Sequence, residues 1–154
     1  MRAPTSSIFS EFYLQHSEIT NIYNLILKHN IEGHFRYVDD ILIIYNENRT
    51  NIDDLLDCFN KLAPKIEFTL EKETYRKISF LDITIYRETN SLSIEVYRKS
   101  TYTDVIIPKD SYHPIEHKIA AIRYLYNRMI TYQLPIENTQ KEYSTIQQIL
   151  TNNK

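Results

Sequence analysis

Two adjacent carboxylates, Asp39 and Asp40, lie between two runs rich in β-branched, aliphatic and aromatic residues, and they are the side chains best placed to do chemistry. The flanking runs, residues 34–38 and 41–45, predict a β-hairpin with both aspartates at its tip. A turn chosen for geometry alone favours Asn-Gly or Asp-Gly, so an Asp-Asp turn accepts strain and indicates that a cation compensates the two charges. Carboxylate oxygens bind Mg²⁺, and a two-metal site can align a 3′-hydroxyl with a triphosphate for in-line attack. The chemistry indicated is nucleotidyl transfer.

A second acidic pair, Asp53 and Asp54, has a simpler explanation. Apolar residues follow it at helical spacing, which predicts an amphipathic helix over 51–62 that begins just before the pair. Carboxylates in the first turn of a helix are explained by the helix dipole. Two adjacent aspartates are therefore weak evidence for a metal site by themselves. A small α+β interaction domain in which Asp39 and Asp40 form only a turn stays open as an alternative.

Composition limits the classes of protein. With 42% apolar and 25% charged residues, the 154-residue chain is typical of one folded domain or part of a larger one. A single glycine excludes glycine-rich phosphate loops. Cys58 stands alone, which excludes a disulfide framework and a cysteine zinc site, and it is predicted to be a small core residue. The sequence has neither an apolar run of about 18 residues nor a signal-peptide profile, so we expect an intracellular protein without membrane contact.

The charges are unevenly distributed along the chain. Residues 34–96 contain eight Lys and Arg against twelve Asp and Glu, whereas residues 97–128 contain six against three. An acidic metal-binding part followed by a basic part suits a polymerase, whose phosphate contacts lie outside its catalytic carboxylates. A solvated helix face would give similar numbers.

The periodicity of apolar residues predicts an α+β fold, with an antiparallel sheet that has helices on one face and a helical segment after it. Residues 8–26 are predicted to form either one helix or two with a break near Ser17, capped by Thr5 or Ser6. The helical part ends before Gly33, the residue suited to a left-handed turn. Alternating residues predict strands at 66–71, 78–86 and 92–96, the last two joined by a turn at 87–91.

Basic and aromatic residues gather after the last of these strands. Residues 97–104 combine two cations, three hydroxyl residues and two tyrosines, groups that can meet phosphate, sugar and base. Pro114 then opens a helix with a predicted apolar face that includes Ile115 and Ile119. A last helix is expected with Thr139 to Glu142 as its capping box. The two helices could form a helix-turn-helix, although a packed helical pair is favoured. The cationic residues predicted to lie largely off the apolar face are His117, Lys118, Arg123 and Arg128.

Several motifs, taken together and in order, resemble the reverse transcriptase of Penelope-like retroelements, and the similarity covers nearly the whole chain. These motifs are Ala3-Pro4-Thr5-Ser6 running into Glu11 to Gln15, Phe35-Arg36-Tyr37-Val38-Asp39-Asp40-Ile41-Leu42, Phe80-Leu81-Asp82-Ile83-Thr84-Ile85, Tyr97 to Asp104, Ser111-Tyr112-His113-Pro114 and His117-Lys118.

The resemblance implies a partial polymerase palm over 1–96, and a primer-grip exit with a partial helical thumb over 97–154. Asp39 and Asp40 would be catalytic ligands of Mg²⁺, with Mn²⁺ as an alternative metal, and the hairpin at 81–98 would be the primer grip. The partners would be an RNA template with a DNA primer and, in the intact parent, a deoxynucleoside triphosphate. The expected nucleotide- and primer-binding residues are Tyr37, Val38, Ala3, Pro4 and Thr5. Those expected to contact nucleic acid are Tyr97, Arg98, Lys99, Thr101, His113, His117, Lys118 and Arg123.

The resemblance also implies what this chain lacks. The family carries its first catalytic aspartate and its fingers upstream of the segment that matches Ala3, and many relatives have a nuclease domain. The expectation is a retrotransposon fragment, nuclear if active as a retroelement enzyme, that does not polymerise DNA by itself. The runner-up interpretation is a host protein that keeps the scaffold as a non-catalytic nucleic-acid-binding module.

Overall fold

The computed structural model describes residues 5–62 and 66–153, and the chain forms two compact units, residues 1–71 and 72–154. Each unit contains one small antiparallel sheet and its own helices, so the predicted α+β class is confirmed. The division between the two units falls between residues 71 and 72. In the described ranges, no helix combines the length and apolarity needed to cross a bilayer.

The first unit begins with a helix, as predicted. α1 (Ser6–Ser17) passes through the single π-helical turn η1 (Glu18–Ile22) into α2 (Tyr23–Lys28), so the break expected near Ser17 is a change of helical register. Thr5 occupies the N-cap position but makes no side-chain capping hydrogen bond. The left-handed residue after α2 is Asn30, with a φ of 51°, and not Gly33 as predicted.

Gly33 is needed for space. It lies in β1 (Ile31–Tyr37) beside a register irregularity, and β1 pairs with β2 (Asp40–Tyr45). A Cβ atom at this position would approach the Phe35 ring to 3.0 Å and the Ile44 side chain to 3.2 Å. A larger residue would force these neighbours apart.

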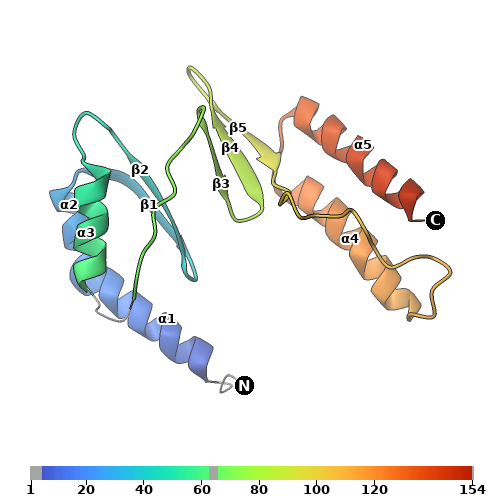
Figure 1. Cartoon of the computed structure of the whole chain (residues 1–154), viewed down its shortest axis with the longest axis horizontal. Helices are drawn as coiled ribbons and strands as arrows, with labels where there is room; N and C mark the ends of the chain where they lie inside the picture. Colours follow the sequence, from blue (N-terminus) through green and yellow to red (C-terminus); the bar gives the residue numbers. More distant parts are fainter. Residues whose placement is uncertain (1–4, 63–65, 154) are drawn as a thin grey trace. The chain divides into compact units, whose positions relative to one another are not determined.

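Helices cover one face of the β1–β2 hairpin (Figure 1). The core consists of four buried residues, Ile22, Ile52, Leu55 and Phe59, and Ile41 and Ile43 from β2 pack against it. α3 (Ile52–Leu62) supplies three of the four, and its N-terminus is capped by Asn51, whose Oδ1 accepts hydrogen bonds from the backbone of Asp53 and Asp54. The predicted helix over 51–62 is thus confirmed. Cys58 is only half-buried on it.

The strand predicted at 66–71 is not present. Ile66, Phe68 and Leu70 do alternate in burial with their neighbours, and Phe68 and Leu70 pack on the core, but the segment pairs with no strand. The Asn60 side chain replaces the missing ladder, since its amide accepts from the Phe68 nitrogen at 2.6 Å and donates to the Phe68 oxygen at 3.2 Å.

In the second unit, three strands form one antiparallel sheet in the order β3 (Lys77–Phe80), β4 (Ile83–Arg87), β5 (Leu92–Val96). The single strand predicted over 78–86 is wrong, because a two-residue turn at Leu81 and Asp82 divides it into β3 and β4. The turn lacks glycine, and Leu81 adopts a φ of 54°. The predicted turn between β4 and β5 is confirmed.

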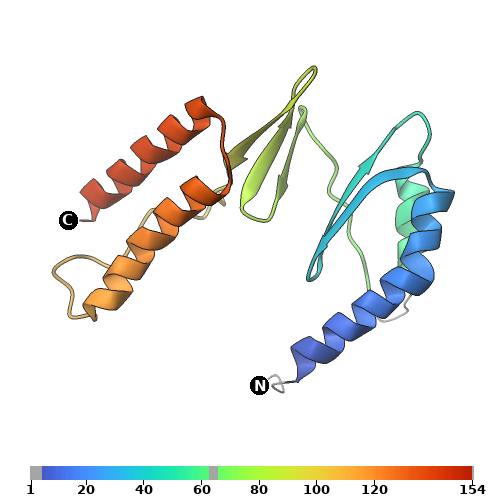
Figure 2. The same ribbon diagram turned by 180° about the vertical axis from the view of Figure 1, so that it is seen from behind.

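Two helices complete the second unit, α4 (Ile115–Thr131) and α5 (Ile136–Asn152), and both views show them side by side and running in opposite directions (Figures 1 and 2). Leu125, Ile146 and Ile149 form their core. The capping box predicted at Thr139 is wrong, because α5 already begins directly after Pro135, where proline fixes the backbone in advance.

Two predictions about the faces of α4 are also wrong. Ile115 and Ile119 are exposed, although they were expected on the apolar face. Arg128 was expected largely off that face, but it is buried.

Candidate functional site

The tip of the β1–β2 hairpin is a two-residue turn. Tyr37 pairs with Asp40 across the strands, so Val38 and Asp39 form the turn and Asp40 is the first residue of β2. The predicted Asp39-Asp40 turn is therefore wrong by one residue. All four residues are exposed, and the two carboxylates are adjacent in the chain and accessible to solvent. The backbone strain predicted for the aspartates is carried by Val38, whose φ is 56°. This is the arrangement of a type II′ turn, in which glycine is the usual first residue.

The two faces of this hairpin differ in chemistry. Phe35, Tyr37 and Ile44 lie on the face that the core does not cover, with 55%, 61% and 44% of their surfaces exposed. Asp40 shares that face, because it is the cross-strand partner of Tyr37. Aromatic rings beside carboxylates can contact the bases of a nucleic acid while the carboxylates hold a cation.

Arg36 lies on the opposite face, which the helices cover, and its guanidinium is fully hydrogen-bonded. Nε donates to Glu18 at 2.7 Å, Nη2 to Glu11 at 2.8 Å, and Nη1 to the Val38 carbonyl oxygen at 3.0 Å. The hydrogen bonds that Arg36 donates to Glu11, and then those to Glu18, hold the pKa of Arg36 above its ordinary value, and the contact with Arg36 lowers the pKa of Glu11. The turn is thus tied to α1 and η1.

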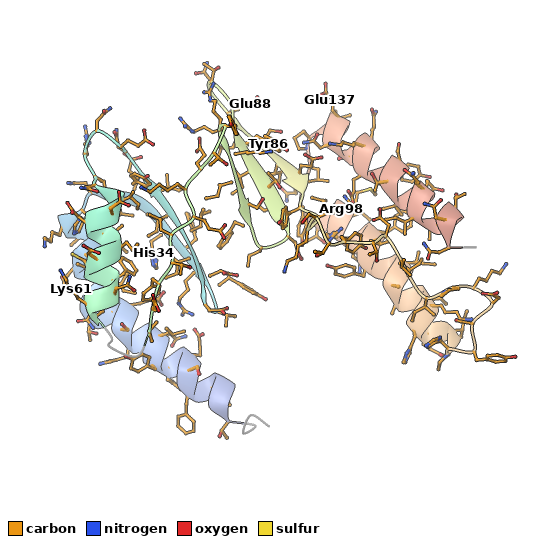
Figure 3. All side chains as sticks on the ribbon, in the orientation of Figure 1. His34, Lys61, Tyr86, Glu88, Arg98 and Glu137 are labelled. Atoms are coloured by element: carbon orange, nitrogen blue, oxygen red, sulfur yellow. The ribbon has the colours of Figure 1, made fainter. Side chains whose placement is uncertain are left out.

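His34 lies on the same covered face and is labelled in Figure 3. Its Nε2 atom is buried without a hydrogen-bond partner in the described structure. Burial lowers the pKa of His34; the nearby Glu18 charge opposes this shift and the Arg36 charge adds to it. Burial on the core side of the hairpin thus favours the neutral form of the imidazole.

The first unit supplies only part of a metal site. Within residues 5–62 and 66–153, no group of three or more His, Cys, Asp or Glu side chains could hold a metal ion. Asp39 and Asp40 are hard oxygen ligands that fit Mg²⁺ or Mn²⁺, so they can supply two ligands, with water or substrate phosphates as the remainder. Of the residues predicted to contact the nucleotide, Thr5 precedes α1, whereas Ala3 and Pro4 lie outside the described residues.

In the second unit, some of the residues after β5 that were predicted to contact nucleic acid are exposed, and Arg98 is instead paired with a side chain of the protein. Lys99 and Thr101 are exposed, and Tyr97 is half-buried. Arg98 forms a bidentate pair with the buried Glu142, at 2.7 and 2.6 Å (Figure 3 labels Arg98). Burial is the largest single influence and lowers the pKa of Arg98, but the hydrogen bonds to Glu142 and the charges of Glu142 and Asp104 together raise it above its ordinary value. Arg98 therefore fixes α5 to the end of β5.

The remaining predicted contacts lie on and before α4. The Nζ atom of Lys118 donates to the backbone oxygens of Lys109 and Ser111, both at 2.6 Å, so this ammonium holds the preceding loop. His113, His117 and Arg123 are exposed. His113 also lines an open groove of about 480 Å³ between α4 and the loop before it, which is otherwise apolar and aromatic and includes Tyr102 and Tyr124.

The sequence motifs include Arg36 and Glu11 without a role for either side chain, and Glu142 was predicted only as part of a capping box. One signal was available for Arg36. Side chains alternate between the two faces of a strand, and Arg36 falls on the same face as its cross-strand neighbour, the apolar Ile41. A cation that faces the core needs a carboxylate partner. No comparable signal identifies Glu142, because its partner Arg98 is 44 residues away.

Comparison with known proteins gives one match. A family model described as the animal helix-turn-helix domain matches residues 105–154, which contain α4, α5 and the loop before them. No curated protein matches the chain. No solved structure matches it either. Residues 105–154 are thus similar to a helix-turn-helix, an interpretation that the sequence analysis ranked below a packed helical pair.

Proposed function

We propose that this chain is the palm-to-thumb part of an RNA-directed DNA polymerase, the reverse transcriptase of a Penelope-like retroelement. The observation that carries the proposal is the tip of the β1–β2 hairpin, where Asp39 in the two-residue turn and Asp40 at the start of β2 present adjacent exposed carboxylates. The order of the motifs along the chain supports the same assignment, with a second hairpin and then two helices after the carboxylates.

In this proposal Asp39 and Asp40 hold Mg²⁺, which Mn²⁺ can replace. The metal, when bound, would activate the 3′-hydroxyl and stabilise charge on the transferred phosphate. Tyr37 and Val38 flank the carboxylates and would contact the primer end or nucleotide. In the described ranges no third carboxylate joins these two, and a loss of about 3 kcal/mol of transition-state stabilisation already lowers a rate more than a hundredfold. We therefore expect this chain by itself to bind the metal without templated synthesis.

Metal binding tests the proposal directly, and the chain contains its own control. Mn²⁺ affinity, measured by electron paramagnetic resonance, is expected to fall at least tenfold in the Asp39→Asn, Asp40→Asn double variant. The matched variant changes the other adjacent pair, Asp53→Asn with Asp54→Asn, and is expected to keep the affinity of the wild type. Equal affinities in all three proteins would contradict the proposal. Templated primer extension by the chain alone would contradict its inactivity.

The helix-turn-helix match favours a second candidate, a non-catalytic module that binds nucleic acid. Its contacts would come from exposed cationic side chains of the second unit, Lys99 and Arg123, together with His113 and His117. Binding of an RNA–DNA duplex, followed by fluorescence anisotropy, is expected to weaken in the Lys99→Ala, Arg123→Ala variant. Lys61→Ala, an exposed lysine of α3, is the control (Figure 3). Binding without any effect of Asp39 and Asp40 substitution on Mn²⁺ affinity would favour this candidate over the first.

A further inference from the structure

Arg36 uses every donor that a guanidinium has. Its five N–H groups meet two oxygens of Glu11, two oxygens of Glu18 and the carbonyl oxygen of Val38, at distances from 2.7 to 3.2 Å. Only 10% of the side chain is exposed. A guanidinium held by two carboxylates is fixed in orientation, so its fifth hydrogen bond, to Val38, is directed and not adventitious.

The two glutamates that hold Arg36 come from the helical side of the unit. Glu11 is in α1 and Glu18 is the first residue of η1, seven residues later, so both lie on one face of the helix. Their combined charge also exceeds the charge of Arg36. An uncompensated arginine three residues from Asp39 would repel a divalent cation, whereas this arginine is compensated.

The third partner is the strained residue of the turn. Val38 has a φ of 56°, which a β-branched side chain rarely adopts and which persists only where neighbouring contacts hold it. The hydrogen bond from Arg36 to the Val38 carbonyl oxygen is such a contact. Because Asp39 and Asp40 follow directly, the orientation of the Val38 peptide constrains the backbone from which both carboxylates extend.

We propose that Arg36 is a positioning residue, which holds the Val38–Asp39 turn against α1 and η1 so that Asp39 and Asp40 converge on one divalent cation. The inference rests on the proposed metal site. It assigns no contact with metal to Arg36 itself, and Glu11 and Glu18 act through Arg36.

Arg36→Lys tests this role, because an ammonium keeps the charge but cannot reproduce the planar set of five donors. Mn²⁺ affinity of the folded variant is expected to fall about tenfold, and amide hydrogen exchange at residues 38–40 is expected to accelerate. Arg87→Lys is the matched control, since Arg87 makes a bidentate pair with Glu73 beside a hairpin of the other unit. Glu18→Gln is a milder second variant that leaves the bonds to Glu11 and Val38 in place.

The outcomes separate positioning from stability and from the metal site itself. A folded Arg36→Lys protein with wild-type Mn²⁺ affinity and wild-type exchange at residues 38–40 would overturn the inference. If Arg36→Lys does not fold, the same two measurements on Glu18→Gln decide. If wild type shows no Mn²⁺ binding that depends on Asp39 and Asp40, the proposed function fails. In that case hydrogen exchange at residues 38–40 alone tests the positioning role. Faster exchange in Arg36→Lys but not in Arg87→Lys supports this role, and equal exchange in the two variants overturns it.

Discussion

Val38 adopts a backbone conformation that costs a non-glycine residue about 1–2 kcal/mol. Its side chain is 57% exposed, so it gains little from burial in return. We expect Val38→Gly to stabilise the first unit by roughly 0.5–1 kcal/mol, after allowance for the larger backbone entropy of glycine in the unfolded chain. Urea unfolding monitored at the first unit measures the change. A loss of stability would mean that the Val38 side chain makes contacts that outweigh the strain.

Leu81 provides a comparison at the equivalent place in the second unit. It is also the first residue of a two-residue turn, with a φ of 54°, but only 41% of its side chain is exposed. Leu81→Gly relieves similar strain and removes more buried surface, so we expect a smaller gain than for Val38→Gly, or a net loss. Equal gains at the two turns would show that backbone strain alone sets the effect.

His34 should make the stability of the first unit depend on pH. Burial lowers its pKa below the ordinary 6.5, with Glu18 and Arg36 as the charged groups that face it. The unfolded chain then binds a proton at a higher pH than the folded chain does. The free energy of unfolding is therefore expected to decrease as pH falls from about 6.5 towards the folded pKa.

His34→Leu removes the titrating group and should flatten this part of the stability profile, measured by urea unfolding between about pH 5 and 7.5. His16→Leu, at an exposed position of α1, is the control and should keep the decrease. A profile that is equally steep in both variants would assign the pH dependence to another group.

At the scale of elements, Asn60 takes the place of a strand partner. Its amide makes two hydrogen bonds to the Phe68 backbone and holds the extended segment against the core. Asn60→Ala is expected to destabilise the first unit by about 1–3 kcal/mol, because the backbone groups of Phe68 lose their partners while part-buried. Asn60→Asp keeps the acceptor for the Phe68 nitrogen and should cost less. Hydrogen exchange at Phe68 separates the two variants from the wild type.

The pair of Arg98 and Glu142 connects β5 to α5 in the second unit. Glu142 is 4% exposed, and Arg128 approaches it from α4 at 3.9 Å. Breaking a buried pair leaves one charge uncompensated, so Glu142→Gln or Arg98→Met alone is expected to cost about 3–5 kcal/mol. The double variant should cost less than the sum of the two, which a double-mutant cycle by urea unfolding measures. Additive costs would mean that the two side chains do not stabilise each other.

The sequence predicts elements best where the side-chain pattern and backbone pairing coincide. The β1–β2 hairpin and α3 follow from such patterns. The prediction of a strand at 66–71 is wrong because alternating apolar residues indicate which side chains are buried and not whether the backbone pairs with another strand. Here the Asn60 side-chain amide makes hydrogen bonds that a neighbouring strand would otherwise make. The β3–β4 turn was missed because Leu81 carries a positive φ without the glycine that normally signals it. The role of Arg98 depends on Glu142, a partner too distant in the chain for any local pattern to reveal.

For the whole molecule, charge divides between the two units. Residues 1–71 hold six Lys and Arg against eleven Asp and Glu, a net charge of −5, and residues 72–154 hold twelve against nine, a net charge of +3. The acidic unit carries the carboxylates proposed to hold a cation, and the basic unit contains the helix-turn-helix match. The net charges predict that a polyanion such as a nucleic acid is attracted by the second unit and repelled by the first. A divalent cation bound between the carboxylates of the first unit and a phosphate of the nucleic acid would remove this repulsion locally.

Hydrogen exchange of the full chain with an RNA–DNA duplex tests this division. Without divalent metal, protection is expected in residues 97–131 and not in the first unit, because only the second unit offers net positive charge. Two or three phosphate contacts predict that affinity falls about 10- to 40-fold between about 50 and 200 mM salt. Addition of Mn²⁺ should extend protection to residues 37–41, and Asp39→Asn with Asp40→Asn should abolish only that extension. Protection confined to the first unit without metal would contradict the assignment of nucleic-acid contacts to the second.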